Sequence, residues 1–422
     1  MATHTLHIGT REVWGQRYNF GIAAANRRRH VYIIGQTGTG KSTLLKNLVA
    51  QDIERGEGVA LIDPHGDLVD DILDLVPPRR IDDVVLLDPS VRHQVVGFNP
   101  FYRVAPDDQS LVASNIVAAF RHVWADSWGP RLEYILYNTV AALLSAPDSC
   151  RASFLAIPRL LVEPSYRKRV VAEVTDERVR SFFEHEFDRW NERQLAEALS
   201  PVQNKIGQVL SSPAVRNVLS QWRPSLDLEA VLAKQQILLV RLPKGELGAD
   251  PANLLGSLLV AGLLQAAMHR PDPATRVPFH LYIDEFQNFT TDAFASVLSE
   301  ARKYALTLTI GHQYFDQLLP SVRAAILGNV GSLIAFRVGA EDAAVLGNEF
   351  GTIGANVLRD LRRGEVVVQL TEDTEVPQAF LGQTVDWCQP YGTRQKVIAQ
   401  SARRYARPRA SVETKIARWL AS

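Results

Sequence analysis

HVYIIGQTGTGKSTLL, residues 30–45, joins a short apolar run to a glycine-rich turn and then to a helical pattern. The run HVYIIG has the β-branched and aromatic composition of a buried strand, and the residues after Lys41 have helical spacing. The turn fits G-x-x-x-x-G-K-S, and a preceding strand and a following helix are the context that a phosphate-binding loop requires. A glycine-rich turn with a chance Lys-Ser pair is the alternative, which this context disfavours.

The turn predicts a site for the phosphates of ATP. Its glycines let backbone N–H groups turn inward around phosphate oxygens, and the helix N-terminus adds a partial positive charge. Lys41 is placed to reach the β- and γ-phosphates, and Ser42 offers a hydroxyl to Mg²⁺. The predicted contacts to ATP and Mg²⁺ come from one continuous segment, Gly35, Gln36, Thr37, Gly38, Thr39, Gly40, Lys41, Ser42 and Thr43.

Two adjacent acids, Asp284 and Glu285, end a second apolar run, LYIDEF. Neighbouring carboxylates at the end of a buried strand repel each other and resist desolvation, so a cation or a reaction is needed to favour them. Because the chain has a phosphate-binding loop, we interpret Asp284 as the acid that holds Mg²⁺ through water. Glu285 is then placed to polarise the water that attacks the γ-phosphate. An acidic turn after a core strand is the alternative.

Two further polar residues follow apolar strands. Gln313 comes just after LTLTIG, where a polar side chain could sense the γ-phosphate, or could be a satisfied polar group at a strand end. Arg337 could act as a finger inserted into the nucleotide of a neighbouring subunit. A salt bridge from Arg337 to Glu341 or Asp342 is the alternative.

DPHGD, residues 63–67, follows another apolar run. It is therefore expected at the carboxyl edge of the sheet, where ligands bind. Asp63 and His65 could contact nucleotide, metal or substrate, or could shape a turn.

Apolar, β-rich runs alternate with helical patterns in two blocks, which indicates an α/β fold. Strands that are apolar on both faces and separated by helices imply a mostly parallel sheet. These runs cover residues 30–35, 58–63, 83–88, 236–242, 279–284, 306–311, 331–338 and 364–370. Between the blocks the pattern is helical, which predicts an all-α insertion. The predicted domains are a nucleotide-binding domain in two parts, 1–104 and 226–390, an all-helical insertion, 105–225, and a basic C-terminal tail with a short helix, 391–422.

Charge and composition limit the partners and the compartment. Lys plus Arg equals Asp plus Glu at 46 each, so a strongly charged partner must meet a local patch. The tail is such a region, because it contains many Lys and Arg residues and a single acid, Glu413. Cys150 and Cys388 lie far apart, which fits a reducing cytoplasm. No signal peptide opens the chain, and the most apolar stretch, residues 254–268, is shorter than a bilayer span. We therefore predict a cytoplasmic protein without a membrane span.

Taken in order, these motifs resemble the HerA/FtsK group of ring-forming ATPases, and look closest to the cytoplasmic motor of conjugative and type IV secretion coupling proteins of the TraG/TraD kind. The resemblance spans about residues 25–385. It rests on IIGQTGTGKSTLL, LIDPHGDL, LYIDEFQNF followed by LSEARKY and the Gln313 strand, IAFRVGAEDA, and SWGPRLEYIL in the helical insertion.

This resemblance implies a RecA-like P-loop core with an inserted all-α domain, and a hexameric ring with nucleotide sites between identical subunits. It implies that DNA, single- or double-stranded, is driven through the central pore by ATP hydrolysis. It also implies a catalytic set that consists of Lys41, Glu285 as the base, Gln313 as the sensor and Arg337 as a finger acting in trans.

Two other functions stay open. The chain could be a scaffolding ring in which ATP governs assembly with an effector such as a nuclease, or an ATPase that assembles a secretion apparatus. The candidate protein partners are accordingly a relaxase, a nuclease or a secretion channel. ATPase activity that DNA stimulates would favour the translocase. Low turnover that DNA does not change, with a stably co-purifying partner, would favour the scaffold.

Overall fold

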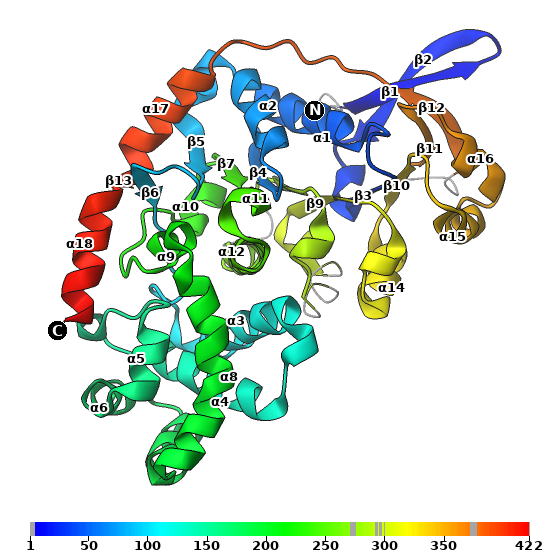
Figure 1. Ribbon diagram of the computed structural model, residues 1–422. Helices are drawn as coiled ribbons and strands as arrows, with labels where there is room; N and C mark the ends of the chain where they lie inside the picture. Colours follow the sequence, from blue (N-terminus) through cyan, green and yellow to red (C-terminus); the bar gives the residue numbers. More distant parts are fainter. Residues whose placement is uncertain are drawn as a thin grey trace. The chain divides into compact units, whose positions relative to one another are not determined.

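The structure is a computed structural model that describes residues 5–270, 276–291, 294, 298, 300–371 and 378–421 (Figure 1). The chain forms two compact units, and each of them gathers segments that are distant in sequence. The first unit consists of Met1–Leu86, Leu228–Arg241 and Leu263–Ser401, and the second of Leu87–Asp227, Leu242–Gly262 and Ala402–Ser422.

An 11-stranded sheet runs through the first unit in the order β2-β1-β12-β11-β10-β3-β9-β8-β4-β7-β5. In chain order its strands are β1 (Thr5–Val13), β2 (Gln16–Ala23), β3 (Val31–Ile34), β4 (Gly58–Asp63), β5 (Val84–Leu87), β7 (Ile237–Arg241), β8 (Phe279–Ile283), β9 (Leu306–His312), β10 (Ser332–Ala335), β11 (Glu365–Gln369) and β12 (Phe380–Thr384). Each pair of neighbours from β10 through β3, β9, β8 and β4 to β7 is parallel. From β10 outward to β2 the pairs are antiparallel.

The predicted α/β fold with a mostly parallel sheet is confirmed. Each of the eight apolar runs contains a strand, and the central ones are buried along their whole length, as in β3 and β4. The sequence analysis missed β1, β2 and β12 at one edge of the sheet. Their residues are partly exposed, so they lack the continuous apolar runs that revealed the central strands.

The helix that follows the phosphate-binding turn, α1 (Lys41–Arg55), packs with α2 (Asp67–Leu75) against the sheet (Figure 1). Leu44, Leu48 and Ile53 of α1 belong to one apolar core with residues of α2 and of the central strands. The first unit also contains α10 (Leu228–Ala233), α14 (Pro320–Asn329), α15 (Ala340–Phe350) and α16 (Ala355–Asp360). The core holds the start of α1 against the ends of the parallel strands, where the site lies.

The apolar stretch predicted as a core helix lies in α12 (Ala249–Met268). By length and composition alone, α12 could cross a membrane, and in the described part of the chain it is the only helix that could. However, 72% of the most apolar 18-residue stretch of this helix is buried within the protein. This burial agrees with the predicted core helix.

The second unit is mostly helical. Its longer helices are α3 (Gln109–Val123), α4 (Pro130–Leu144), α5 (Ala156–Val162), α6 (Pro164–Val171), α8 (Glu192–Ser211) and α9 (Pro213–Leu219), and the short ones are α7 (Glu177–Ser181) and α11 (Lys244–Leu247). It also has a two-stranded sheet of β6 (Gln94–Val96) and β13 (Ala406–Pro408). The helix α8 begins with a capping box, in which the Asn191 side chain accepts from the Gln194 N–H and the Gln194 side chain accepts from the Asn191 N–H.

The basic tail contains more structure than the one short helix predicted. It forms α17 (Arg394–Tyr405), then β13, and then α18 (Arg409–Leu420), in which Val412, Ile416 and Trp419 are buried. Those three residues repeat at helical spacing and give α18 one apolar face. Their burial shows that the tail packs onto the protein.

Candidate active site

The phosphate-binding turn is anchored on the ends of two neighbouring strands. The Gly35 N–H donates to the carbonyl oxygen of His312 at the end of β9, at 3.3 Å. The Gln36 N–H donates to the carbonyl oxygen of Arg337, just after β10, at 2.9 Å. Because β3 pairs in parallel with both strands, the turn emerges at the carboxyl edge of the sheet. This is the position in which α/β folds bind ligands.

Two glycines are required by the shape of this turn. Gly40 has φ 123°, a conformation that residues with a Cβ rarely adopt. A Cβ on Gly35 would lie 2.5 Å from the Cβ of Phe336, so only glycine fits there. Residues 36–38, which lie between them, are exposed. The turn is therefore fixed at its ends and open to a ligand at its middle.

Lys41 lies inside the curve of the turn and is buried. Its Nζ donates to the carbonyl oxygens of Gly35, at 2.5 Å, and Gln36, at 3.3 Å. Burial lowers the pKa of Lys41, and the negative charges of Glu285 and Asp284 oppose that shift. The ammonium group is thus held in the loop near the acidic pair, and its contact with phosphates stays a prediction. Ser42 beside it is exposed.

Asp284 and Glu285 follow β8 and are 5% and 6% exposed, so this pair carries buried negative charge. Burial raises the pKa of the Asp284 carboxyl to about 7, the charges of Glu285 and Asp63 add to the shift, and Lys41 opposes it. One lysine therefore does not fully neutralise the site. An additional cation at Asp284 would favour its ionised form.

Glu285 has a left-handed backbone, with φ 46° and ψ 50°, which is uncommon for a residue with a side chain. Three hydrogen bonds hold its backbone: its N–H donates to Asp284 Oδ1 at 3.0 Å, and its carbonyl oxygen accepts from Asn288 Nδ2 at 2.7 Å and from the Asn288 N–H at 3.1 Å. Backbone strain of this kind costs about 1–3 kcal/mol and concentrates at functional sites. The strain thus supports a functional role for Glu285.

Two amides orient the Glu285 carboxylate. Gln313 Nε2 donates to Oε1 at 2.9 Å, and Gln287 Nε2 donates to Oε2 at 2.7 Å. The structure thus brings together Glu285 and Gln313, which the sequence placed in one site; sensing of the γ-phosphate by Gln313 stays a prediction. Gln287 was missed, although it stands in the same DEFQNF motif, two residues after the predicted base.

Arg337 lies beside the turn with an exposed side chain. In the part of the chain that the structure describes, it forms no salt bridge, so the alternative pairing with Glu341 or Asp342 is not observed there. Asp342 instead accepts a hydrogen bond from the Phe315 N–H at 3.0 Å. The guanidinium is thus available to a ligand, and its role in trans stays a prediction.

For Asp63, the turn-shaping alternative agrees with the structure. Its Oδ1 accepts from the His65 N–H at 2.8 Å, and its Oδ2 accepts from the N–H groups of Leu68 and Val69 in the first turn of α2. A carboxylate in this position stabilises a helix N-terminus. Asp63 therefore affects the site through its negative charge, which helps to raise the pKa of Asp284. The His65 side chain is exposed.

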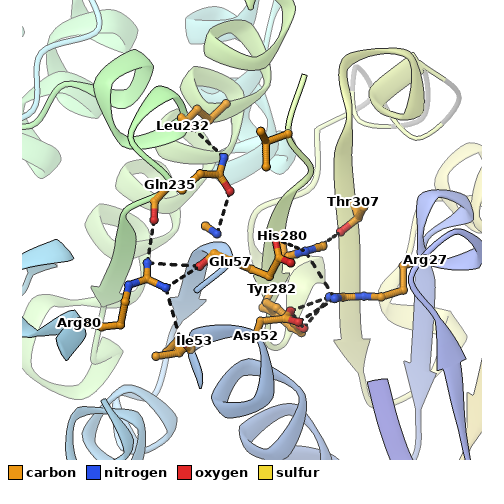
Figure 2. Close-up of polar contacts among 12 residues, drawn as sticks. Arg27, Asp52, Ile53, Glu57, Arg80, Leu232, Gln235, His280, Tyr282 and Thr307 are labelled. Atoms are coloured by element: carbon orange, nitrogen blue, oxygen red, sulfur yellow. Dashed lines mark hydrogen bonds and ion pairs between the residues drawn. The ribbon is translucent and has the colours of Figure 1, made fainter. Parts of the chain in front are cut away.

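A buried ion pair, together with a tyrosine of β8, forms a brace between α1 and β8 (Figure 2). Both Nη atoms of Arg27 donate to the carboxylate of Asp52 in α1, at 2.7 and 2.6 Å, and the Tyr282 hydroxyl donates to the same carboxylate at 2.5 Å. Burial alone would raise the pKa of Asp52. The positive charge of Arg27 and the hydrogen bonds from Arg27 and Tyr282 outweigh burial and hold this pKa below its usual range. The helix that carries Lys41 is thereby tied to the strand that carries Asp284.

His280 extends this network, as Figure 2 shows. Its Nδ1 lies 2.6 Å from Thr307 Oγ1 and its Nε2 lies 3.4 Å from Arg27 Nη1. Burial lowers the His280 pKa to about 4, so the ring is neutral at pH 7. The sequence analysis missed the brace. Its one local signal is the pair of polar side chains at alternate positions, His280 and Tyr282, in an otherwise apolar strand.

Magnesium fits this site better than a metal held by protein ligands alone. Among the described residues, no group of three or more His, Cys, Asp or Glu could hold a metal ion. Mg²⁺ instead usually keeps several waters and binds one or two carboxylates together with substrate phosphates. Asp284, with its raised pKa, and the exposed hydroxyl of Ser42 are the residues that would hold it.

Fold and motifs together define the class: the chain has the fold of the HerA/FtsK-type P-loop ATPases. The family model described as "Helicase HerA, central domain" matches residues 16–102, which contain the phosphate-binding turn, α1, β4 and α2. No curated protein sequence matches the chain.

Among solved structures, the chain is similar to a conjugative coupling protein. The unbound form of the bacterial protein TrwB has 16% sequence identity and a TM-score of 0.63, with 88% of each chain covered. TrwB in complex with ADP and Mg²⁺ also has 16% identity, with a TM-score of 0.64, 94% of this chain and 98% of that chain covered. VirB4 of Thermoanaerobacter pseudethanolicus has 12% identity and a TM-score of 0.56, with 92% of this chain and 98% of that chain covered. These matches confirm the predicted resemblance at the level of the fold.

Proposed function

We propose that this protein hydrolyses ATP and uses the energy to move DNA through a hexameric ring of identical subunits. The observation that carries the proposal is the meeting of Lys41, the buried Asp284–Glu285 pair and Gln313 at one edge of the sheet. A lysine inside a phosphate-binding turn and an oriented carboxylate beside it are the parts that phosphoryl transfer to water needs.

In the proposed reaction, the N–H groups of the turn and the start of α1 bind the phosphate oxygens of ATP. Lys41 exchanges the carbonyl oxygens of Gly35 and Gln36 for phosphate oxygens. Glu285, oriented by Gln287 and Gln313, accepts a proton from the attacking water. Bound Mg²⁺ supplies positive charge that stabilises the charge developing on the phosphates.

The DNA substrate is inferred from the fold. TrwB, described as a conjugative coupling protein, is similar to the chain over 88% of its length. A ring that moves DNA binds the phosphate backbone without reading sequence, through local Lys and Arg patches that a chain of zero net charge can still present. Single- and double-stranded DNA both remain candidate substrates, and a relaxase, a nuclease or a secretion channel are the candidate protein partners.

The ATPase rate with and without DNA tests this function. We expect purified protein to hydrolyse ATP faster when single- or double-stranded DNA is added, and electron microscopy to show six-fold particles. The Lys41→Ala variant, purified in the same way, is the control, because we expect it to lose the turnover that depends on the phosphate-binding turn. An ATPase rate that neither DNA changes would exclude the translocase. In that case the scaffolding ring or the secretion ATPase, which need the same site, would replace it.

Arg337 gives a separate test of the ring. Arg337→Ala subunits and Lys41→Ala subunits are each expected to be inactive alone. If Arg337 acts in trans, mixing them should restore part of the ATPase activity, because some interfaces then combine an intact turn with an intact arginine. Measuring the rate against mixing ratio checks this expectation. No recovery at any ratio, in rings shown to contain both subunits, would argue for an internal role of Arg337 in its own subunit.

A further inference from the structure

The second unit contains a cavity of about 640 Å³ between the C-terminal tail and the segments around residues 151–155 and 220–223. Five cationic side chains line it: Arg151, Arg223, Arg407, Lys415 and Arg418. Among the described residues that line the cavity there is no Asp or Glu. A cavity of one sign of charge concentrates ligands of the opposite sign.

These cations are not neutralised by neighbouring acids. Arg407 Nη1 donates to two neutral acceptors, Gln221 Oε1 at 3.0 Å and the Arg223 carbonyl oxygen at 2.8 Å. Lys415 and Arg418 are exposed, three residues apart on one side of α18, and form no ion pair with any described residue. The positive charge of the cavity is therefore available to an anionic ligand.

The single acid of the tail does not change this balance. Glu413 accepts from Arg409 Nε at 2.7 Å and from Asn217 Nδ2 at 3.0 Å. Arg409 and Asn217 do not line the cavity. The carboxylate is thus bound elsewhere, and the cations of α18 that face the cavity keep their charge.

The lining also contains apolar and aromatic side chains. Leu155, Val412 and Ile416 contribute aliphatic surface, and Trp222 stands at the cavity with the guanidinium of Arg223 4.3 Å from its ring centre. Ser153, Ser220 and Gln221 add polar groups to the lining.

We propose that this cavity binds single-stranded nucleic acid, with its phosphates at the cations and a base against the apolar wall by Trp222. Aromatic and arginine surfaces that stack bases, set in a positive groove, are the usual means of binding a single strand without sequence preference. A volume of about 640 Å³ has room for one or two nucleotides and not for a duplex. The proposal concerns a site separate from the ATP site and does not depend on ATP hydrolysis.

The test measures binding of a fluorescent 12-nucleotide oligo(dT) to the full chain without ATP. In the variant Lys415→Gln/Arg418→Gln we expect the dissociation constant to rise by about tenfold at low salt, and the slope of log K against log salt to fall by about 1.4, since two phosphate contacts are lost. The matched control is Lys396→Gln/Arg403→Gln, which removes the same charge from exposed positions of α17 outside the cavity. Its binding should equal that of the unaltered chain.

Two additions keep the result interpretable. The charge-preserving variant Lys415→Arg/Arg418→Lys should bind as the unaltered chain does, and thermal melting should show that all variants fold. The proposal would be overturned if the cavity variant and the control variant bound oligo(dT) equally well. It would also be overturned if poly-glutamate at equal charge displaced oligo(dT), because that result would point to acidic peptides as the ligand. Either negative result leaves DNA stimulation of the ATPase to be judged by its own measurement.

Discussion

Replacing Glu285 with glutamine is expected to stop ATP turnover while ATP stays bound. Glutamine keeps the size of the side chain and one acceptor oxygen, and its NH2 group can donate to the other amide once that amide turns its oxygen inward, but it cannot take a proton from water. Loss of a general base of this kind lowers the rate by about 10²–10⁴-fold. The binding contacts at the turn are unchanged, so the dissociation constant for ATP should stay close to that of the unaltered chain.

Single-turnover hydrolysis and equilibrium binding of ATP check this prediction together. Glu341→Gln is a suitable control, because Glu341 is an exposed acid at the start of α15 and makes no contact with Glu285 in the described structure. Its turnover should be normal. A Glu285→Gln protein that hydrolyses ATP at the unaltered rate would show that another group activates the water.

Replacing Asp52 with alanine is expected to destabilise the first unit by about 3–5 kcal/mol, because it leaves the buried guanidinium of Arg27 without its counter-charge. The Tyr282 hydroxyl loses its acceptor in the same step. Since Asp52 ties α1 to β8, the variant should also bind ATP more weakly at temperatures where it is still folded. Denaturant unfolding and nucleotide binding measure the two effects.

The same helix offers a matched control. Glu54 in α1 also pairs with an arginine, Arg79, but both side chains are largely exposed. Water already solvates that pair, so Glu54→Ala should change the free energy of unfolding little. The double variant Arg27→Met/Asp52→Leu should recover much of the lost stability, because it removes the unpaired charge. Equal losses in Asp52→Ala and Glu54→Ala would mean that the buried pair is not a brace.

The fold was predictable where local sequence carries the whole signal. The central strands are buried on both faces, so each is a continuous apolar run, and the phosphate-binding turn encodes its glycines, lysine and serine within nine residues. The edge strands β1, β2 and β12 were not predictable in this way. β12 pairs with β1 across more than 350 residues of sequence, as Gly9 opposite Thr384 shows, and all three strands are partly exposed.

The candidate site shows the same difference between residues that local motifs reveal and residues that only tertiary packing brings together. Lys41, Asp284 and Glu285 could be proposed from the sequence because they stand in motifs next to β3 and β8. The brace of Arg27, Asp52 and Tyr282 joins three distant segments, and no spacing rule connects them. Tertiary packing alone brings such groups together.

The most direct test of the whole account is whether the purified chain binds and cleaves ATP with Mg²⁺. We predict that it retains Mg²⁺–ATP, releases phosphate, and loses turnover when Lys41 is replaced by alanine. Protein that is folded but neither binds nor hydrolyses any nucleoside triphosphate would contradict the account.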